Sequence, residues 1–163
     1  LLPGLPMVNI YSVDKDLLGF LRKEFSTDLV IHVNSALLQS YPLDLDFNAA
    51  SGVAFIEVGQ HTFTVTVYAG GKLLIQQECD YQAGLDVVYT LVNILRQLEL
   101  DEQQVKVKLG GVIATDAGVY QEMYKFLPHL EWMQRLPGFS YITRMQEIPG
   151  HYFHNLYALA LCV

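Results

Sequence analysis

Residues 53–80 contain three short strand-like runs, separated by two turns that contain glycine: the first run is apolar with one charge, and in the other two apolar and polar side chains alternate. In the middle run Phe63, Val65 and Val67 fall on one side, while threonines and a tyrosine fall on the other. Strict period-two alternation of threonine, valine and aromatic residues is typical of a strand with a buried face. Glycine reaches positive φ without steric cost, which suits it to the tight turns between strands. The stretch therefore predicts a three-stranded antiparallel meander.

The chain after the meander alternates between helical and strand-like patterns. Apolar residues recur at helical spacing in three stretches and at strand spacing in two. The predicted elements are helices over residues 84–98, 117–127 (capped by Thr115 or Asp116) and 152–161, and strands over residues 105–109 and 139–144. The order for residues 53–163 is βββαβαβα. That order predicts an α/β fold with a mixed sheet and helices on both faces.

The chain before the meander gives a second, shorter α/β pattern. Strands are expected over residues 8–11 and 29–33, with a helix between them that Asp14 caps. A further helix, capped by Asn34 or Ser35, is expected to run to about Tyr41 and to stop at Pro42. Residues 42–52 are rich in Pro, Asp, Asn, Ser and Gly and read as a connection. This βαβα order matches the end of the βββαβαβα order predicted for residues 53–163. We therefore predict two lobes: residues 1–45 as the C-terminal part of a first lobe, and residues 46–163 as a complete second lobe.

Composition narrows the classes of function. The formal net charge of −7, without a basic cluster, argues against a nucleic-acid partner. No apolar run reaches the roughly 18 residues that a membrane-spanning helix needs. Cys79 and Cys162 lie in apolar surroundings and read as buried reduced thiols, which favours a cytoplasmic setting. The hydrophobic content of 52% is high, so we expect a protein partner or a homo-oligomer to bury part of it.

The run from Ala54 to Thr64, Ala-Phe-Ile-Glu-Val-Gly-Gln-His-Thr-Phe-Thr, followed by Gly-Lys-Leu-Leu at residues 71–74, resembles an uncharacterised bacterial family known from Bacteroidetes. That family is a domain of unknown function with an actin-like ATPase fold, related to the ribonuclease-H-like unit. Residues 9–41 also resemble the part of the family that precedes its second lobe. The resemblance implies a two-lobed fold, and we expect the first strands of the first lobe to lie upstream of Leu1.

The same resemblance implies where nucleotide would bind. In actin-like ATPases the first hairpin of the second lobe carries Asp-x-Gly, whose amides approach phosphate and whose carboxylate acts through a magnesium-bound water. Glu57, Gly59, Gln60 and His61 occupy those positions here, so Asp is replaced by the longer Glu and small residues by Gln-His. A later Gly-Gly pattern that packs against adenosine in the superfamily matches Gly110 and Gly111, ahead of a helix. These six residues are the candidate nucleotide site, with ATP and magnesium as its candidate ligands.

Other chemistry has weaker support in the sequence. His151 and His154 are spaced i, i+3, with Cys162 beyond them, but no third ligand is evident, and we assign no metal site. No nucleophile motif occurs, and we assign no catalytic residue. Asp44 and Asp46 read as solvated residues of a connection.

Two hypotheses of function remain open. In the first, the chain is a non-catalytic actin-like module that acts through protein contacts and carries a degenerate nucleotide site. In the second, its full-length form is an actin-like ATPase that binds ATP between two lobes. A ribonuclease-H-like nuclease ranks behind both, because only Glu57, Asp80 and Asp116 could supply acidic ligands.

Overall fold

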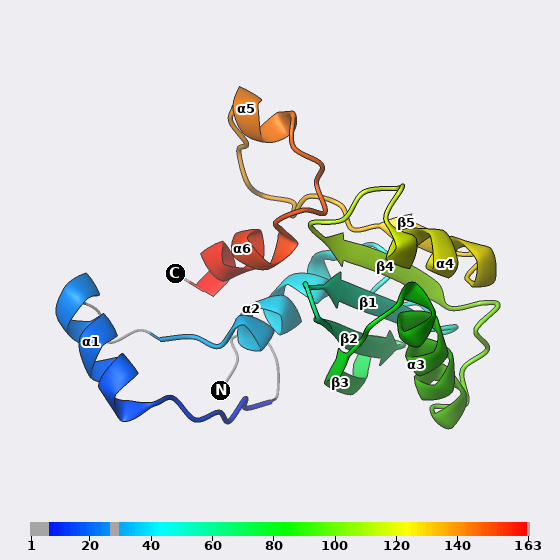
Figure 1. The fold of residues 1–163 in the computed structure, drawn as a ribbon, viewed down its shortest axis with the longest axis horizontal. Coiled ribbons are helices and arrows are strands. Elements are labelled where there is room, and N and C mark those ends of the chain that lie inside the picture. Colours follow the sequence, from blue (N-terminus) through cyan, green and yellow to red (C-terminus); the bar gives the residue numbers. More distant parts are fainter. Residues whose placement is uncertain (1–6, 27–29, 163) are drawn as a thin grey trace.

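The structure is a computed structural model that describes residues 7–26 and 30–162. Its centre is a five-stranded mixed sheet with the strand order β3-β2-β1-β4-β5 (Figure 1). The strands are β1 (Val53–Val58), β2 (Thr62–Ala69), β3 (Lys72–Asp80), β4 (Lys106–Gly111) and β5 (Leu130–Trp132). The first three pair antiparallel, whereas β4 is parallel to β1 and β5 is parallel to β4. The predicted meander and mixed sheet are confirmed.

The turn between β2 and β3 shows why glycine is needed there. Gly70 and Gly71 both have positive φ, 53° and 73°. Positive φ at both central residues of a two-residue loop makes its twist match that of the paired strands. Ala69 pairs with Lys72 beside the turn, and a register shift between Val67 and Tyr68 then sets which side chains of β3 lie beside the rest of β2.

Helices cover both faces of the sheet, as predicted (Figure 1). One face, with Ile56 and Leu109, packs against α3 (Gly84–Gln97) and α4 (Gly118–Phe126). The opposite face packs against α2 (Val33–Ser40) and α6 (His154–Leu159). Both faces of β2 are therefore buried. Each fully buried large apolar side chain contributes about 1.5–3 kcal/mol to such a core.

The remaining helical elements are short or stand apart. They are α1 (Lys15–Phe25), the 3-10 turn η1 (Tyr41–Leu43), α5 (Thr143–Gln146) and the 3-10 turn η2 (Ala160–Cys162). The carboxylate of Asp14 accepts hydrogen bonds from the backbone N–H groups of Asp16 and Leu17, which confirms the predicted cap of α1. None of the residues of α1 is buried, and the helix lies away from the sheet (Figure 1).

Three predicted strands are wrong where the structure describes them. Residues 8–11 and 30–32 are irregular, and α2 already begins at Val33, with His32 rather than Asn34 or Ser35 at its N-cap. Position 29 lies outside the described residues. Residues 139–142 are irregular and α5 follows them, whereas the fifth strand lies earlier, at Leu130–Trp132. In place of the βαβα order expected before the meander, the described residues therefore form two helices.

The predicted division at residue 45 stays a prediction. Leu37 and Tyr41, on the first-lobe side of that division, belong to one core cluster with Phe55 of β1 and Ala158 of α6. Within the described residues, no helix is both long and apolar enough to cross a membrane.

Candidate functional site

Four of the six residues predicted to bind nucleotide lie around one cavity. β1 and β4 are adjacent and parallel, so their carboxyl ends meet, and Glu57 is in register with Gly110. The turn after β1 adds Gly59 and Gln60. Ligand sites of open α/β sheets commonly lie at this edge, beyond the carboxyl ends of the strands.

We call this space the hairpin cavity. Its volume is about 580 Å³, and its lining includes Glu57, Gly59, Gln60 and Gly111, with α2 and α6 supplying further walls. The volume lies in the range of small-molecule sites. His61 is exposed on the hairpin turn and Gly110 is buried, and neither lines the cavity. The structure therefore brings four predicted residues together and leaves two outside.

The two glycines at the end of β4 have separate structural reasons. A Cβ at Gly110 would lie 2.9 Å from both carboxylate oxygens of Glu57 and 2.8 Å from the sulfur of Met133. Gly111 has a φ of 116°, and a Cβ there would lie 2.3 Å from the carbonyl oxygen of Val58. Gly110 thus makes room for the Glu57 carboxylate, and Gly111 lets the chain bend past β1.

Glu57 pairs with a residue distant in the sequence. Its Oε1 lies 2.7 Å from Nδ1 of His154, at the start of α6. The side chains are only 10% and 5% exposed. The imidazole also stacks on the ring of Tyr41, with 5.9 Å between ring centroids. The carboxylate that the resemblance assigns to a magnesium-bound water is therefore held against a histidine.

The turn at Gly59 uses its own backbone groups. The Gly59 N–H donates to the carbonyl of Thr62 at 2.8 Å, and its carbonyl accepts a hydrogen bond from the Tyr81 hydroxyl at 2.8 Å. In a phosphate-binding hairpin the amide of this glycine points at the ligand. Here the Gly59 amide already has an acceptor within the hairpin.

The charges around the hairpin cavity are negative. Glu57, Thr64 and Glu78 are register partners on β1, β2 and β3, so they lie in one row on the same face of the sheet. All three line the cavity, and Glu78 is exposed. Among the described lining residues there is no lysine or arginine. A like charge about 4 Å away costs an anion roughly 4 kcal/mol at an effective dielectric constant of about 20.

The histidines of the last segment have different partners. His151 stacks on Trp132, with centroids 3.9 Å apart, and its Nε2 lies 3.0 Å from the carbonyl oxygen of Ile113. Its burial lowers the pKa of His151. No cluster of three or more His, Cys, Asp or Glu suited to a metal occurs in residues 7–26 and 30–162.

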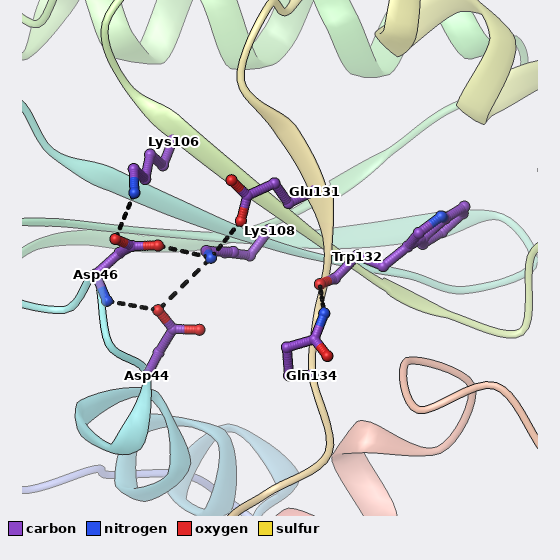
Figure 2. Close-up of polar contacts among 7 residues, drawn as sticks. All are labelled: Asp44, Asp46, Lys106, Lys108, Glu131, Trp132 and Gln134. Atoms are coloured by element: carbon purple, nitrogen blue, oxygen red, sulfur yellow. Dashed lines mark hydrogen bonds and ion pairs between the residues drawn. The ribbon is translucent and has the colours of Figure 1, made fainter.

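A second group of charged residues lies toward the amino ends of the parallel strands (Figure 2). We call it the lysine cluster: Asp44, Asp46, Lys106, Lys108 and Glu131. Nζ of Lys108 lies 2.7 Å from both Asp46 and Glu131, and 3.8 Å from Asp44. Nζ of Lys106 lies 2.6 Å from the other oxygen of Asp46.

The lysine cluster corrects the prediction that Asp44 and Asp46 are solvated. Their side chains are 17% and 19% exposed, and that of Lys108 is 6% exposed. Burial alone would lower the pKa of Lys108, but the hydrogen bonds that its ammonium group donates to Asp46 and Glu131 hold that pKa above its usual value. The hydrogen bonds from Lys106 and Lys108 hold the pKa of Asp46 below its usual value. The cluster borders a cavity of about 550 Å³, which Arg135 also lines.

Sequence reasoning missed Thr64 and Glu78, which line the hairpin cavity beside Glu57, and it missed His154, which pairs with Glu57 without lining that cavity. Glu57 is the only charged residue in a strand that is otherwise apolar, which is a signal that it has a buried partner. His154 is 97 positions away, so no local pattern identifies it. The pairing at the turn, continued along β2, would place Gln77 opposite Thr64, and a register shift between Val67 and Tyr68 places Glu78 there instead, so the turn alone does not identify Glu78.

Comparison with solved structures defines the class of fold. A protein from Bacteroides thetaiotaomicron, described as having an actin-like ATPase fold and unknown function, superposes with a TM-score of 0.69 at 18% identity. The match covers 93% of this chain and 52% of that one, so the chain spans about half the length of this relative. The fold is that of the actin-like ATPases.

The chain belongs to a family of proteins of unknown function, DUF3822, whose model matches residues 1–130. This bears out the resemblance to an uncharacterised family with an actin-like fold. No curated protein matches the chain.

Two further solved structures match half of this chain. They are an exopolyphosphatase from Cytophaga hutchinsonii (TM-score 0.36) and a Ppx/GppA family member from Aquifex aeolicus (TM-score 0.34). Each is 12% identical, and the match covers 50% of this chain and 34% of the other chain. Similarities this low carry no argument about this protein.

Proposed function

We propose that this chain is a non-catalytic actin-like module that acts through protein contacts and has a degenerate nucleotide site. The observation that carries the proposal is the 2.7 Å pairing of Glu57 with His154 at the end of β1. A carboxylate that acts through a magnesium-bound water must face the ligand. Glu57 is instead buried against an imidazole.

The charge of the hairpin cavity supports the same proposal. A nucleotide triphosphate brings several negative charges, and actin-like phosphate sites meet them with backbone amides. The Gly59 amide is bonded to Thr62, and the described lining adds Glu57 and Glu78 without a lysine or arginine. α6 is only six residues long, so it offers little dipole to an anion.

An exposed apolar surface supports protein contacts. α1 carries Leu17, Phe20 and Phe25, which are 50%, 57% and 68% exposed, and it buries none of its residues. A helix with an apolar stripe is normally stabilised by packing that stripe on another surface. We infer that the surface of a protein partner covers this stripe when the module is bound to that partner.

The test of this proposal is calorimetric titration with ATP and magnesium. We expect no saturable heat at millimolar nucleotide. Saturable binding that is lost in Gly59→Leu and retained in Gly19→Leu would overturn the proposal. Gly19 is the matched control because it lies on α1, away from the cavity, and a Cβ there meets nothing within 4 Å.

The second candidate is an ATP-binding protein of the actin-like type, whose longer form binds nucleotide between two lobes. It is favoured by the position of the hairpin cavity at the carboxyl ends of β1 and β4, with Glu57, Gly59, Gln60 and Gly111 in its lining. The same titration on a longer form of the protein decides between the two candidates.

A further inference from the structure

We propose that the hairpin cavity receives the side chain of a lysine or arginine from a partner polypeptide. This inference rests on the proposed function, because it names the chemistry of a contact made by a module that acts through protein contacts. It assigns an occupant to a cavity of about 580 Å³ in which the described lining has two carboxylates and no lysine or arginine.

The row of Glu57, Thr64 and Glu78 gives the cavity its preference for a cation. Adjacent strands lie about 4.8 Å apart, so the two glutamates at the ends of the row are separated by roughly 10 Å at their Cα atoms. Thr64 lies between them and adds a hydroxyl oxygen. An ammonium or guanidinium group beside Glu78 and Thr64 would donate a charge-assisted hydrogen bond to Glu78, about twice as strong as a neutral one, while the buried Glu57 adds its negative charge from a greater distance.

Glu78 supplies a charge that no other described residue pairs with. It is exposed on β3 and makes no ion pair in the described part of the chain, whereas Glu57 is held against His154. Glu78 is therefore the residue to change in a test.

The other walls fit the stem of a long basic side chain. Leu37 from α2, and Tyr152 and Phe153 ahead of α6, line the cavity beside the carboxylates. The methylene groups of lysine and arginine pack on apolar surface while their charged ends reach polar groups. Aromatic faces also attract cations, because the face of the ring carries the negative part of its quadrupole.

The mouth of the cavity favours a polypeptide over a free amine. Val33, Val112 and Leu156 line it and are 38%, 64% and 57% exposed. A small amine would leave these apolar side chains in water, whereas residues flanking a lysine or arginine would cover them. The formal net charge of −7 also attracts a basic partner at long range.

The experiment is a calorimetric titration of the protein with the peptide acetyl-Leu-Arg-Leu-amide and with the same peptide carrying citrulline. Citrulline keeps the shape of arginine without its charge. We expect the arginine peptide to bind about tenfold more tightly, and salt near 1 M to weaken it. Glu78→Gln should weaken it about fivefold to tenfold, and Glu78→Lys should abolish saturable binding.

The matched control is Glu24→Gln, which removes the same charge from α1, outside the cavity. It should leave peptide binding unchanged. Glu78 is exposed, and we expect its variants to keep the thermal unfolding midpoint of the original chain, so any lost binding reports on the cavity.

Several results would overturn the inference. They are equal binding of the two peptides, no effect of Glu78→Lys, tighter binding of putrescine than of the arginine peptide, or a homodimer that dissociates in Glu78→Lys. The last two would assign the cavity to a free amine or to a second copy of the chain. If neither the arginine peptide nor ATP binds, this inference fails and the proposed function stands. If ATP binds, the proposed function itself is overturned.

Discussion

The two ends of the parallel strands carry carboxylates in different settings. At the amino end, the lysine cluster joins three carboxylates to Lys106 and Lys108, and the shortest nitrogen–oxygen distances are 2.6–2.7 Å (Figure 2). At the carboxyl end, the hairpin cavity has Glu57 against His154 and Glu78 without an ion pair among the described residues. Carboxylates that are paired with lysines stabilise the fold, whereas a carboxylate that lines a cavity without an ion pair is available to a ligand.

We infer from this difference that the lysine cluster has a structural role and that the hairpin cavity has a binding role. The lysine cluster joins the connection before β1 to β4 and β5, because Asp46, Lys108 and Glu131 come from those three segments. Beside the hairpin cavity, Glu57 and His154 hold α6 against β1, whereas the carboxylate of Glu78 makes no ion pair among the described residues. Variants at these positions should therefore differ in whether they affect stability or binding.

The largest expected loss of stability is for His154→Ala. The change leaves the Glu57 carboxylate buried without a partner and removes the imidazole that stacks on Tyr41. Removing one partner of a buried pair costs about 3–5 kcal/mol. Urea unfolding should show the free energy of unfolding lowered by that amount, while His129→Ala, an exposed histidine, should change it by less than about 0.5 kcal/mol.

A double variant sharpens this prediction. Glu57→Gln combined with His154→Ala removes the unpaired charge, so it should recover part of the lost stability. A double variant no more stable than His154→Ala would mean that lost packing, rather than the buried carboxylate, causes the effect.

A smaller loss is expected for Lys108→Met. Methionine keeps most of the apolar stem, but Asp44, Asp46 and Glu131 lose their shared cation. The carboxylates are partly exposed, so we expect a loss of about 1–3 kcal/mol, below that for a fully buried pair. Lys72→Met, at an exposed position of β3, is the control and should leave the unfolding midpoint nearly unchanged. An equal loss in both variants would contradict a special role of Lys108.

The smallest effect concerns acid stability. The pKa of Asp46 lies below its usual value because Lys106 and Lys108 donate hydrogen bonds to it, so the unfolded chain takes up its proton first. Its contribution is complete above the ordinary carboxyl pKa, near 4, and is lost as the pH falls through the folded pKa. Asp46→Asn should therefore flatten the fall of the unfolding midpoint below about pH 4. An unchanged pH dependence would show that Asp46 does not contribute to stability in acid.

The sequence predicts the parts of the fold that depend on local pattern. The meander follows from alternation in β2 and from the glycines of its turns, and α3 from its apolar stripes. β5 is missed because it has only three residues and its pairing with β4 is a tertiary contact. Residues 8–11 show strand-like alternation but lack a neighbouring strand in the described chain, and a strand needs ladder partners to form.

The candidate site is predictable to the same limit. Glu57, Gly59 and Gln60 are close in sequence, and the adjacency of β1 and β4 brings Gly111 to them. The contact with His154 depends on how α6 packs on the sheet, which no local pattern encodes. The lysine cluster is missed for a similar reason: the sequence predicts that Asp44 and Asp46 are solvated residues of a connection, but that connection folds over Lys108.

The central claim is that the hairpin cavity selects cations and not nucleotides. It is tested most directly by amide chemical shifts of the nitrogen-15-labelled protein, titrated separately with the arginine peptide and with ATP and magnesium. We predict that the peptide shifts the amides of Glu57, Thr64 and Glu78 and that ATP leaves them unmoved. Saturable shifts of Gly59 and Gly111 with ATP, and none with the peptide, would contradict the claim.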